Sequence, residues 1–141
     1  MDTLQTELAT RCLWSLQEVS IEIEGLMLTS VDGLALTTTM QGDEGSQRLA
    51  AVATTMFLLG EDMTQAWGSG ESTELFIKLM NDAGETRYVY MVPVGFRAVL
   101  VAIVRMKWLA PELYRDLRKA SQYLDSVLDG EVPPAPQWGF P

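Results

Sequence analysis

The chain has 141 residues, 48% of them hydrophobic and 21% charged, a composition that favours a single globular domain over a disordered segment. Its formal net charge is −9, and up to Glu74 twelve acidic residues stand against two basic ones, which excludes nucleic acid as an expected partner. There is no histidine and one cysteine, Cys12, so the sequence offers neither the usual general base nor an internal disulfide nor a zinc site.

The first segment, residues 2–20, predicts an amphipathic helix. One stripe of that helix is apolar and consists of Leu4, Leu8, Cys12, Leu16 and Val19. Trp14 falls on the opposite, charged side. Asp2 and Glu7 occupy positions where a secretory signal would be basic, so we expect no signal peptide and a cytoplasmic location, which also suits the lone cysteine.

A hairpin and a long helix are predicted next. The runs LMLTSV and LALTTTM flank Asp32-Gly33, which is typical of a two-residue turn with positive φ at both positions. The loop QGDEGS precedes a helix over about 46–66, with Gly45 or Ser46 as its N-cap. The segment WGSGES ends this helix, and GSG at 68–70 lacks the strand and helix context of a phosphate-binding loop.

Three strands and a final helix complete the predicted domain, residues 1–130. TELFIKLM, TRYVYMVPV and RAVLVAIV predict a meander, and the unbroken apolar run AVLVAIV indicates a central strand covered on both faces. A helix from Pro111 has an apolar stripe of Leu113, Leu117, Ala120, Leu124 and Val127, and a tail rich in proline and aromatic residues follows at 131–141. The predicted fold class is α+β. A five-stranded, mainly antiparallel sheet is sandwiched between the long helix on one face and the N- and C-terminal helices on the other.

The stretch LAAVATTMFLLG, residues 49–60, carries no charge, yet it is shorter than the about 20 residues of a membrane span, so no membrane insertion is expected. At about 100° per residue, one stripe is the natural face for the sheet, comprising Leu49, Val52, Met56, Leu59, Met63 and Trp67. The opposite face then holds Ala50, Ala51, Thr54, Phe57 and Leu58, with Glu61 continuing the line. Either another segment of the chain or a second protein covers this uncharged face, and we favour the second protein.

The order of elements resembles the Roadblock/dynein-light-chain family. The resemblance runs from about Ile23 to Leu128 and is carried by the strand pair around Asp-Gly, the helix RLAAVATTMFLLGEDM and the strands ending in AVLVAIV. It implies a profilin-like sheet and a homodimer paired through the long helix and TELFIKLM. For bacterial and archaeal members it also implies a Ras-like small GTPase as partner, which is activated or scaffolded. The implied dimer or partner surface consists of Ala50, Ala51, Thr54, Phe57, Leu58, Glu61, Phe76 and Lys78.

Two classes of function are open at this point. The first is a non-enzymatic homodimeric interaction module that binds and regulates or scaffolds a Ras-like small GTPase. The alternative is a sensor that binds a small ligand on a profilin-like sheet, for which Tyr88 and Tyr90 are the only obvious polar handles. Glu61 and Asp62 point about 100° apart on a helix and do not form an acid/base pair. We therefore expect no active site, no cofactor and no metal, and predict the interaction module.

Overall fold

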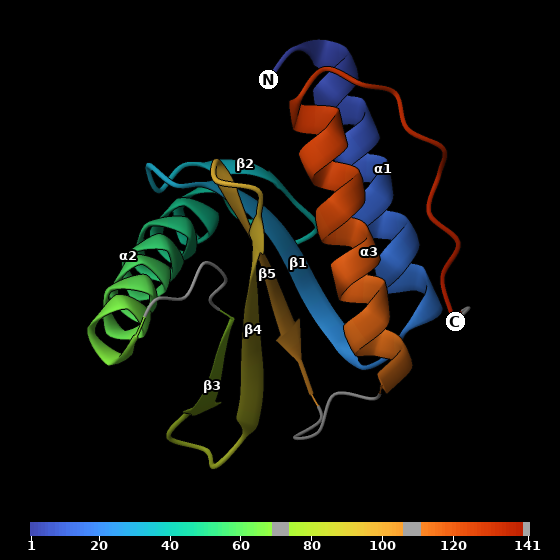
Figure 1. The fold of residues 1–141 in the computed structure, drawn as a ribbon. Helices are drawn as coiled ribbons and strands as arrows, with labels where there is room; N and C mark the ends of the chain where they lie inside the picture. Colours follow the sequence, from blue (N-terminus) through green and yellow to red (C-terminus); the bar gives the residue numbers. More distant parts are fainter. Residues whose placement is uncertain (69–73, 106–110, 140–141) are drawn as a thin grey trace.

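A five-stranded antiparallel sheet lies between two layers of helices in the computed structural model, which describes residues 1–68, 74–105 and 111–139. The elements are α1 (Thr3–Val19), β1 (Ile23–Ser30), β2 (Ala35–Thr38), α2 (Asp43–Trp67), β3 (Leu75–Met80), β4 (Thr86–Val94), β5 (Ala98–Val104) and α3 (Pro111–Leu128). The strand order is β2-β1-β5-β4-β3. Figure 1 shows α2 on one face of the sheet and the α1–α3 pair on the other. The predicted α+β sandwich is confirmed.

The central strand, β5, is covered on both faces. Leu100 and Ala102 belong to the apolar cluster beneath α1 and α3, whereas Val99 and Val101 belong to the cluster beneath α2. This division follows from the strand geometry, because successive side chains point to opposite faces of a sheet. The unbroken apolar run of this strand therefore has the double cover that the sequence predicted.

The α1–α3 layer buries large side chains. All five residues of the predicted α3 stripe are buried, and α1 buries Ala9, Cys12, Leu13 and Leu16. The predicted α1 stripe is correct at Cys12 and Leu16 but wrong at its ends, because Leu4 and Val19 lie in the first and last turns and are exposed. Trp14 is exposed, as expected for the charged side of the helix.

Two predicted boundaries are wrong, and a glycine explains each of them. Four residues, 31–34, connect β1 and β2, Ser30 N donates to Leu34 O at 2.9 Å, and only Gly33, with φ 87°, takes a positive φ there. The helix α2 begins at Asp43, three residues before the predicted start, after Gly42 with φ 95°. Gly42 permits the turn into the helix without strain, and the acidic side chains that follow it favour a helix N-terminus.

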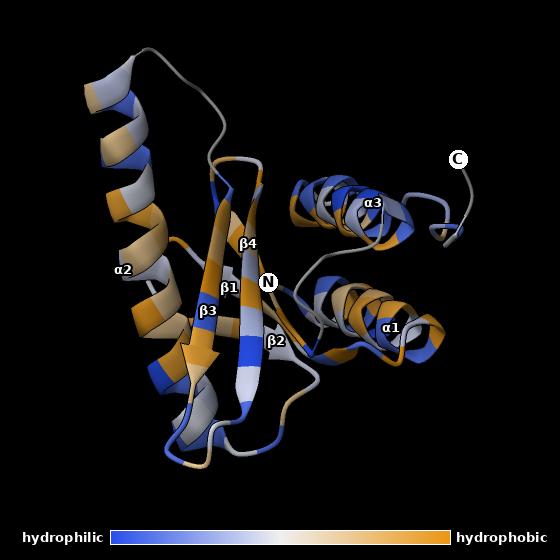
Figure 2. Cartoon of the chain, turned by 90° about the horizontal axis from the view of Figure 1, so that it is seen from below, coloured by the Kyte–Doolittle hydropathy of each residue, from blue (hydrophilic) through white to orange (hydrophobic). Residues whose placement is uncertain are grey.

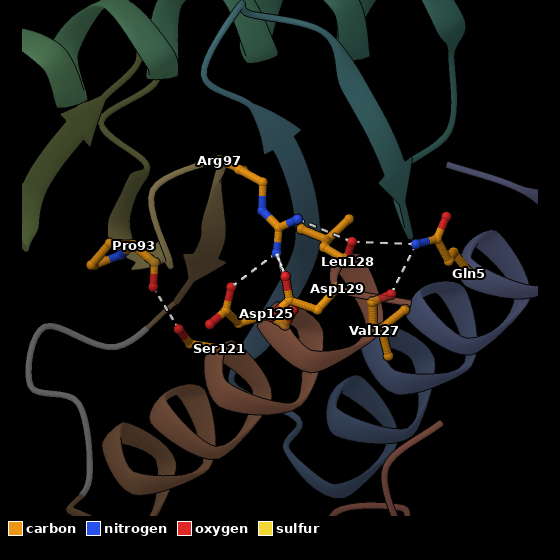
Figure 3. A network of polar contacts seen from close by, with 8 residues as sticks. All are labelled: Gln5, Pro93, Arg97, Ser121, Asp125, Val127, Leu128 and Asp129. Atoms are coloured by element: carbon orange, nitrogen blue, oxygen red, sulfur yellow. Dashed lines mark hydrogen bonds and ion pairs between the residues drawn. The ribbon is translucent and has the colours of Figure 1, made fainter. Parts of the chain in front are cut away.

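The C-terminal end of α3 is held by side chains from other elements (Figure 3). Arg97 donates to Leu128 O at 3.1 Å and pairs with Asp129 Oδ1 at 2.7 Å. Gln5 of α1 donates through Nε2 to Val127 O at 3.0 Å. The last carbonyls of a helix have no partner within it, so these bonds satisfy groups that would otherwise need water. They also fix the position of α3 against α1 and the β4–β5 turn.

Candidate interaction surface

The helix α2 contacts the sheet through its smaller residues. The buried residues of its middle turns are Ala50, Ala53, Thr54, Phe57 and Gly60. Thr54 Oγ1 donates to Ser30 O at 3.2 Å, and Phe57 packs in the cluster that contains Met27. Alanine and glycine at this contact bring the helix close to the sheet, and one phenylalanine fills the remaining space.

The predicted orientation of α2 is therefore wrong. Ala50, Thr54 and Phe57 were expected to face away from the sheet, but their exposed fractions are 0%, 4% and 4%. Of the same predicted face, Ala51 and Leu58 are exposed and Glu61 is half-buried. Both stripes of this helix are apolar, and the prediction assigned the bulkier one to the sheet. Of that stripe, Leu49 and Met56 do pack against the cluster beneath α2, whereas the other four residues are exposed. Close packing of small residues decides the orientation instead.

The outward side of α2 carries the large apolar side chains. We call these residues the α2 band: Val52, Leu58, Leu59, Met63 and Trp67. Leu59 is 58% exposed, Met63 73% and Trp67 93%. A groove of about 250 Å³ lies on the same side, lined by Ala51, Val52, Thr55 and Met56, and Figure 2 shows hydrophobic segments along much of the helix. A continuous row of large exposed apolar side chains marks an interaction surface.

The edge strand β3 adds an open row of backbone groups to this region. Its inner side pairs with β4, and its outer side pairs with no strand of the described residues. At the other edge of the sheet, Ala35 N of β2 donates to the Gln47 side chain at 3.4 Å, and Thr37 bonds to Thr10 of α1. The Gln47 side chain therefore occupies one backbone donor of β2, whereas the outer backbone groups of β3 pair with no strand of the described residues and could pair with a partner strand.

The predicted β3 residues do not share a face with the α2 band. Phe76 stacks on Tyr88, with ring centroids 5.6 Å apart, and contacts Tyr90, so Phe76 and Lys78 lie on the α1–α3 side of the sheet. Leu75 and Ile77 point to the α2 side. The two tyrosines predicted as handles for a ligand thus pack against Phe76. Phe76 and Lys78 thus lie on the opposite side of the sheet from α2. The partner role of Ala51, Leu58, Glu61, Phe76 and Lys78 stays a prediction.

The ionisable groups of the described residues provide neither a reactive thiol nor a metal site. Burial raises the pKa of Cys12 to about 12, so its thiol is protonated at neutral pH. Within the described parts of the chain, no three His, Cys, Asp or Glu side chains lie together as a metal site would require. No helix in those parts has the length and apolarity to cross a membrane. Gly68 is the C-cap of α2, as its predicted helix-ending role requires, whereas residues 69 and 70 lie outside the described residues.

A sheet between helices, with one apolar helix face and one open edge, defines a protein-interaction domain, and the comparison with family models identifies which one. Residues 14–104 match the Roadblock/LC7 domain. The match covers more than half of the chain, and the protein belongs to the Roadblock/LC7 family. The comparison with curated protein sequences gives no significant match.

Solved structures share the fold at low sequence identity. MglB of Myxococcus xanthus is 18% identical, with a TM-score of 0.76 over 96% of this chain and 98% of that one. The Roadblock/LC7 domain from Streptomyces avermitilis is 16% identical, with a TM-score of 0.76 over 85% and 97%. The gliding protein MglB from Thermus thermophilus is 15% identical, with a TM-score of 0.76 over 93% and 96%. These similarities show a common fold.

Proposed function

We propose that the chain is a non-enzymatic homodimeric interaction module that binds a Ras-like small GTPase and regulates or scaffolds it. The observation that carries the proposal is the α2 band, a row of large apolar side chains that the described residues leave exposed, in a member of the Roadblock/LC7 family. Leu59 and Met63 contribute little to the fold when they face water. Their place on the outer side of α2 is explained by a protein surface that covers them.

The dimer follows from the open edge of β3. Two copies related by a two-fold axis perpendicular to the sheet pair their β3 edges antiparallel, which closes both edges and leaves none to propagate. The same axis keeps the two α2 helices on one face of the joined sheet. The α2 bands of both copies then line a single surface, part of which buries in the dimer while the rest is available to the partner.

The GTPase partner is the class implied by the family resemblance, and the charge distribution supports it. The acidic excess up to Glu74 favours association with a partner that has a basic face. Arg48 is exposed near the N-terminal end of α2. We expect regulation to come from reshaping the GTPase's own site and not from Arg48 as an inserted arginine.

The dimer is tested by sedimentation equilibrium at micromolar concentration. The wild type should have twice the 15.7 kDa mass of the chain. The double variant Leu59→Glu with Met63→Glu should sediment as a monomer, because it introduces charge into the α2 band that the proposed dimer partly buries. Phe96→Glu is the matched control, because Phe96 is 94% exposed in the β4–β5 turn, and it should stay dimeric. A monomeric wild type would contradict the proposed dimer.

The partner is tested with Ras-like GTPases from the same genome, each loaded with GDP or with a non-hydrolysable GTP analogue. One of them should bind the wild type with a clear preference for one nucleotide state and should not bind the Leu59→Glu, Met63→Glu variant. Arg48→Ala should keep both binding and any stimulation of hydrolysis. Binding of no GTPase in either state would contradict the proposal. Loss of stimulation with intact binding in Arg48→Ala would contradict the reshaping mechanism alone.

A further inference from the structure

The tail that follows α3 is not used by the proposed function, yet it has a defined position. Residues 131–139 run back along the outer side of α1 and α3, away from the sheet (Figures 1 and 2). The chain reverses at Gly130, with φ 89°, and Glu131 N donates to Ser126 O at 3.1 Å. This is the glycine-based ending that lets a helix pass into a segment of opposite direction. The tail therefore forms an outer layer on the α1–α3 pair.

Three consecutive tail residues are recognised by polar groups of both helices. Lys119 Nζ donates to Gln137 O at 2.8 Å, and the Trp138 indole Nε1 donates to Ser15 Oγ at 3.0 Å. Gly139 N donates to both carboxylate oxygens of Asp116, at 3.0 and 3.2 Å. The helices thus form hydrogen bonds with three groups of the tail: the carbonyl of Gln137, the indole N–H of Trp138 and the backbone N–H of Gly139.

Asp116 is the buried acidic side chain that contacts the tail. It is 5% exposed, although it belongs to a helix whose inner positions are otherwise apolar. A buried carboxylate is costly unless donors satisfy it, and here the tail's Gly139 N–H donates to it while Lys119 Nζ of the same helix lies 3.9 Å from Oδ1. An apolar side chain would pack two helices without this requirement. The position of Asp116 is therefore explained by recognition of a backbone N–H.

Clefts adjoin both the proline and the tryptophan parts of the tail. A cleft of about 270 Å³ lies between α3 residues, Tyr123 among them, and the tail prolines Pro133, Pro134 and Pro136. Further along, a cleft of about 250 Å³ opens between Trp138 and the α1 and α3 side chains. Proline-rich segments bind such grooves with a small loss of entropy, because they are already extended. Gly139 takes φ 78°, so the residue after tryptophan is glycine for a conformational reason.

We propose that the outer groove between α1 and α3 is a recognition site for proline-rich segments that carry Trp-Gly, and that a partner protein inserts such a segment by displacing the chain's own tail. The polar contacts lie at residues 137–139, whereas Val132, Pro134 and Ala135 are exposed, so the tail is held mainly at its far end. A tethered tail has an effective concentration of about millimolar, so it keeps weak ligands out and yields to tighter ones. The groove is therefore open only to a segment that binds tightly enough to displace the tail.

The test uses the full chain and a fluorescent synthetic peptide with the sequence of residues 131–141. Trp138→Ala removes the main anchor of the tail and opens the groove. The peptide should bind this variant at least tenfold more tightly than it binds the wild type, whose own tail competes. Adding Asp116→Asn should abolish binding, whereas adding Asp82→Asn, which changes an exposed acid in the β3–β4 turn, should not.

Peptide controls define the class of ligand. A peptide with alanine in place of the tryptophan should not bind, and one with alanines in place of the prolines should bind at least fivefold more weakly. If the folded Trp138→Ala variant fails to bind the parent peptide, the tail is a fixed cover and the proposal is wrong. If the peptide without prolines binds equally well, the assigned class of ligand is wrong.

Two measurements on the wild type guard against a variant that fails to fold. In spectra of the ¹⁵N-labelled chain, excess unlabelled peptide should shift the Trp138 indole and Gly139 amide signals as the tail is displaced, and unchanged signals at high peptide concentration would overturn the proposal. Assemblies larger than a dimer that require Trp138 would show the tail exchanged between copies, which contradicts a separate partner. The α2 band does not enter these measurements, so this proposal and the proposed function can fail independently.

Discussion

The two helical layers use their apolar side chains in opposite ways. In the α1–α3 layer the large residues face the sheet, as with Leu16, Leu117 and Leu124, and the tail packs on the outside. In the α2 layer small residues and one phenylalanine, Phe57, face the sheet, whereas Leu59 and Met63 face outward. One layer is complete within the chain. The other leaves large apolar side chains exposed in the described residues.

This difference separates the stability of the fold from the capacity to bind. A leucine that is fully buried stabilises the monomer by removing apolar surface from water, whereas a leucine that stays exposed does so only on association. The α1–α3 layer is therefore expected to dominate the stability of the isolated chain. The α2 band is expected to dominate association, and the two contributions can be changed separately.

The largest expected effect distinguishes the two sides of α2 directly. Phe57→Ala should lower the free energy of unfolding by about 3–5 kcal/mol, because it leaves a cavity beneath the helix. Leu59→Ala should change it by no more than about 0.5 kcal/mol, because this side chain is exposed. Both are measured by urea denaturation in a Met63→Glu background, at a dilution where sedimentation gives a monomer, so that dissociation does not contribute. Equal losses in the two variants would show that α2 is rotated from its position in this structure.

Much of the fold was predictable because it depends on local patterns. The order of elements, the doubly covered β5 and the α3 stripe follow from hydrophobic periodicity along single segments. The orientation of α2 was not predictable in this way, because both of its stripes are apolar. Choosing between them depends on how closely Ala50, Ala53 and Gly60 approach the sheet, which is a property of the packed structure.

The tail site shows a second limit of sequence reasoning. Ser15, Asp116 and Trp138 come from three segments of the chain, and Ser15 and Trp138 are 123 residues apart in sequence. No spacing rule connects them. The available signals were an aspartate close to an apolar helix stripe and an aromatic residue in a proline-rich tail, which together suggest a polar contact between the two. Only the reversal of the chain at Gly130 brings them together.

A smaller effect is expected from removing the outer cover of the α1–α3 layer. Trp138→Ala should lower the free energy of unfolding by about 1–2 kcal/mol, because a half-buried indole and one hydrogen bond are lost. Phe96→Ala, which removes another aromatic side chain from an exposed position, should have no measurable effect. The comparison is made by thermal denaturation of both variants. If Trp138→Ala also leaves the free energy of unfolding unchanged, the tail does not stabilise the α1–α3 layer.

The attachment of α3 is expected to contribute less again. Arg97→Ala removes the donors to Leu128 O and to Asp129 and should cost about 0.5–1 kcal/mol, the usual range for a partly exposed charge at a helix C-terminus. Arg97→Lys keeps the charge but not the planar fork and should recover only part of the loss. Hydrogen exchange of the last turn of α3 is the sensitive measurement. Faster exchange there, without faster exchange in α2, would confirm that Arg97 acts on one layer only.

The smallest effect concerns a cluster of charged side chains near the start of β4. Arg87 shares a face of β4 with Val89. Glu24 accepts from Arg87 Nε at 2.7 Å and from Arg105 Nε at 3.2 Å. The hydrogen bond from Arg87 is the main cause that lowers the pKa of Glu24, and Arg105 lowers it further.

Because the pKa of Glu24 is lower in the folded chain than in the unfolded one, ionised Glu24 stabilises the fold above the unfolded value of about 4.3. That stabilisation is lost as the pH falls from there through the folded pKa. Glu24→Gln should therefore be less stable than the wild type at pH 7, by less than about 1 kcal/mol since the pair is partly exposed. The difference should disappear at pH 2–3 and shrink in high salt. Glu18→Gln, an exposed change on α1, is the control, and a deficit in Glu24→Gln that is equal at both pH values would show a packing effect instead of an ionic one.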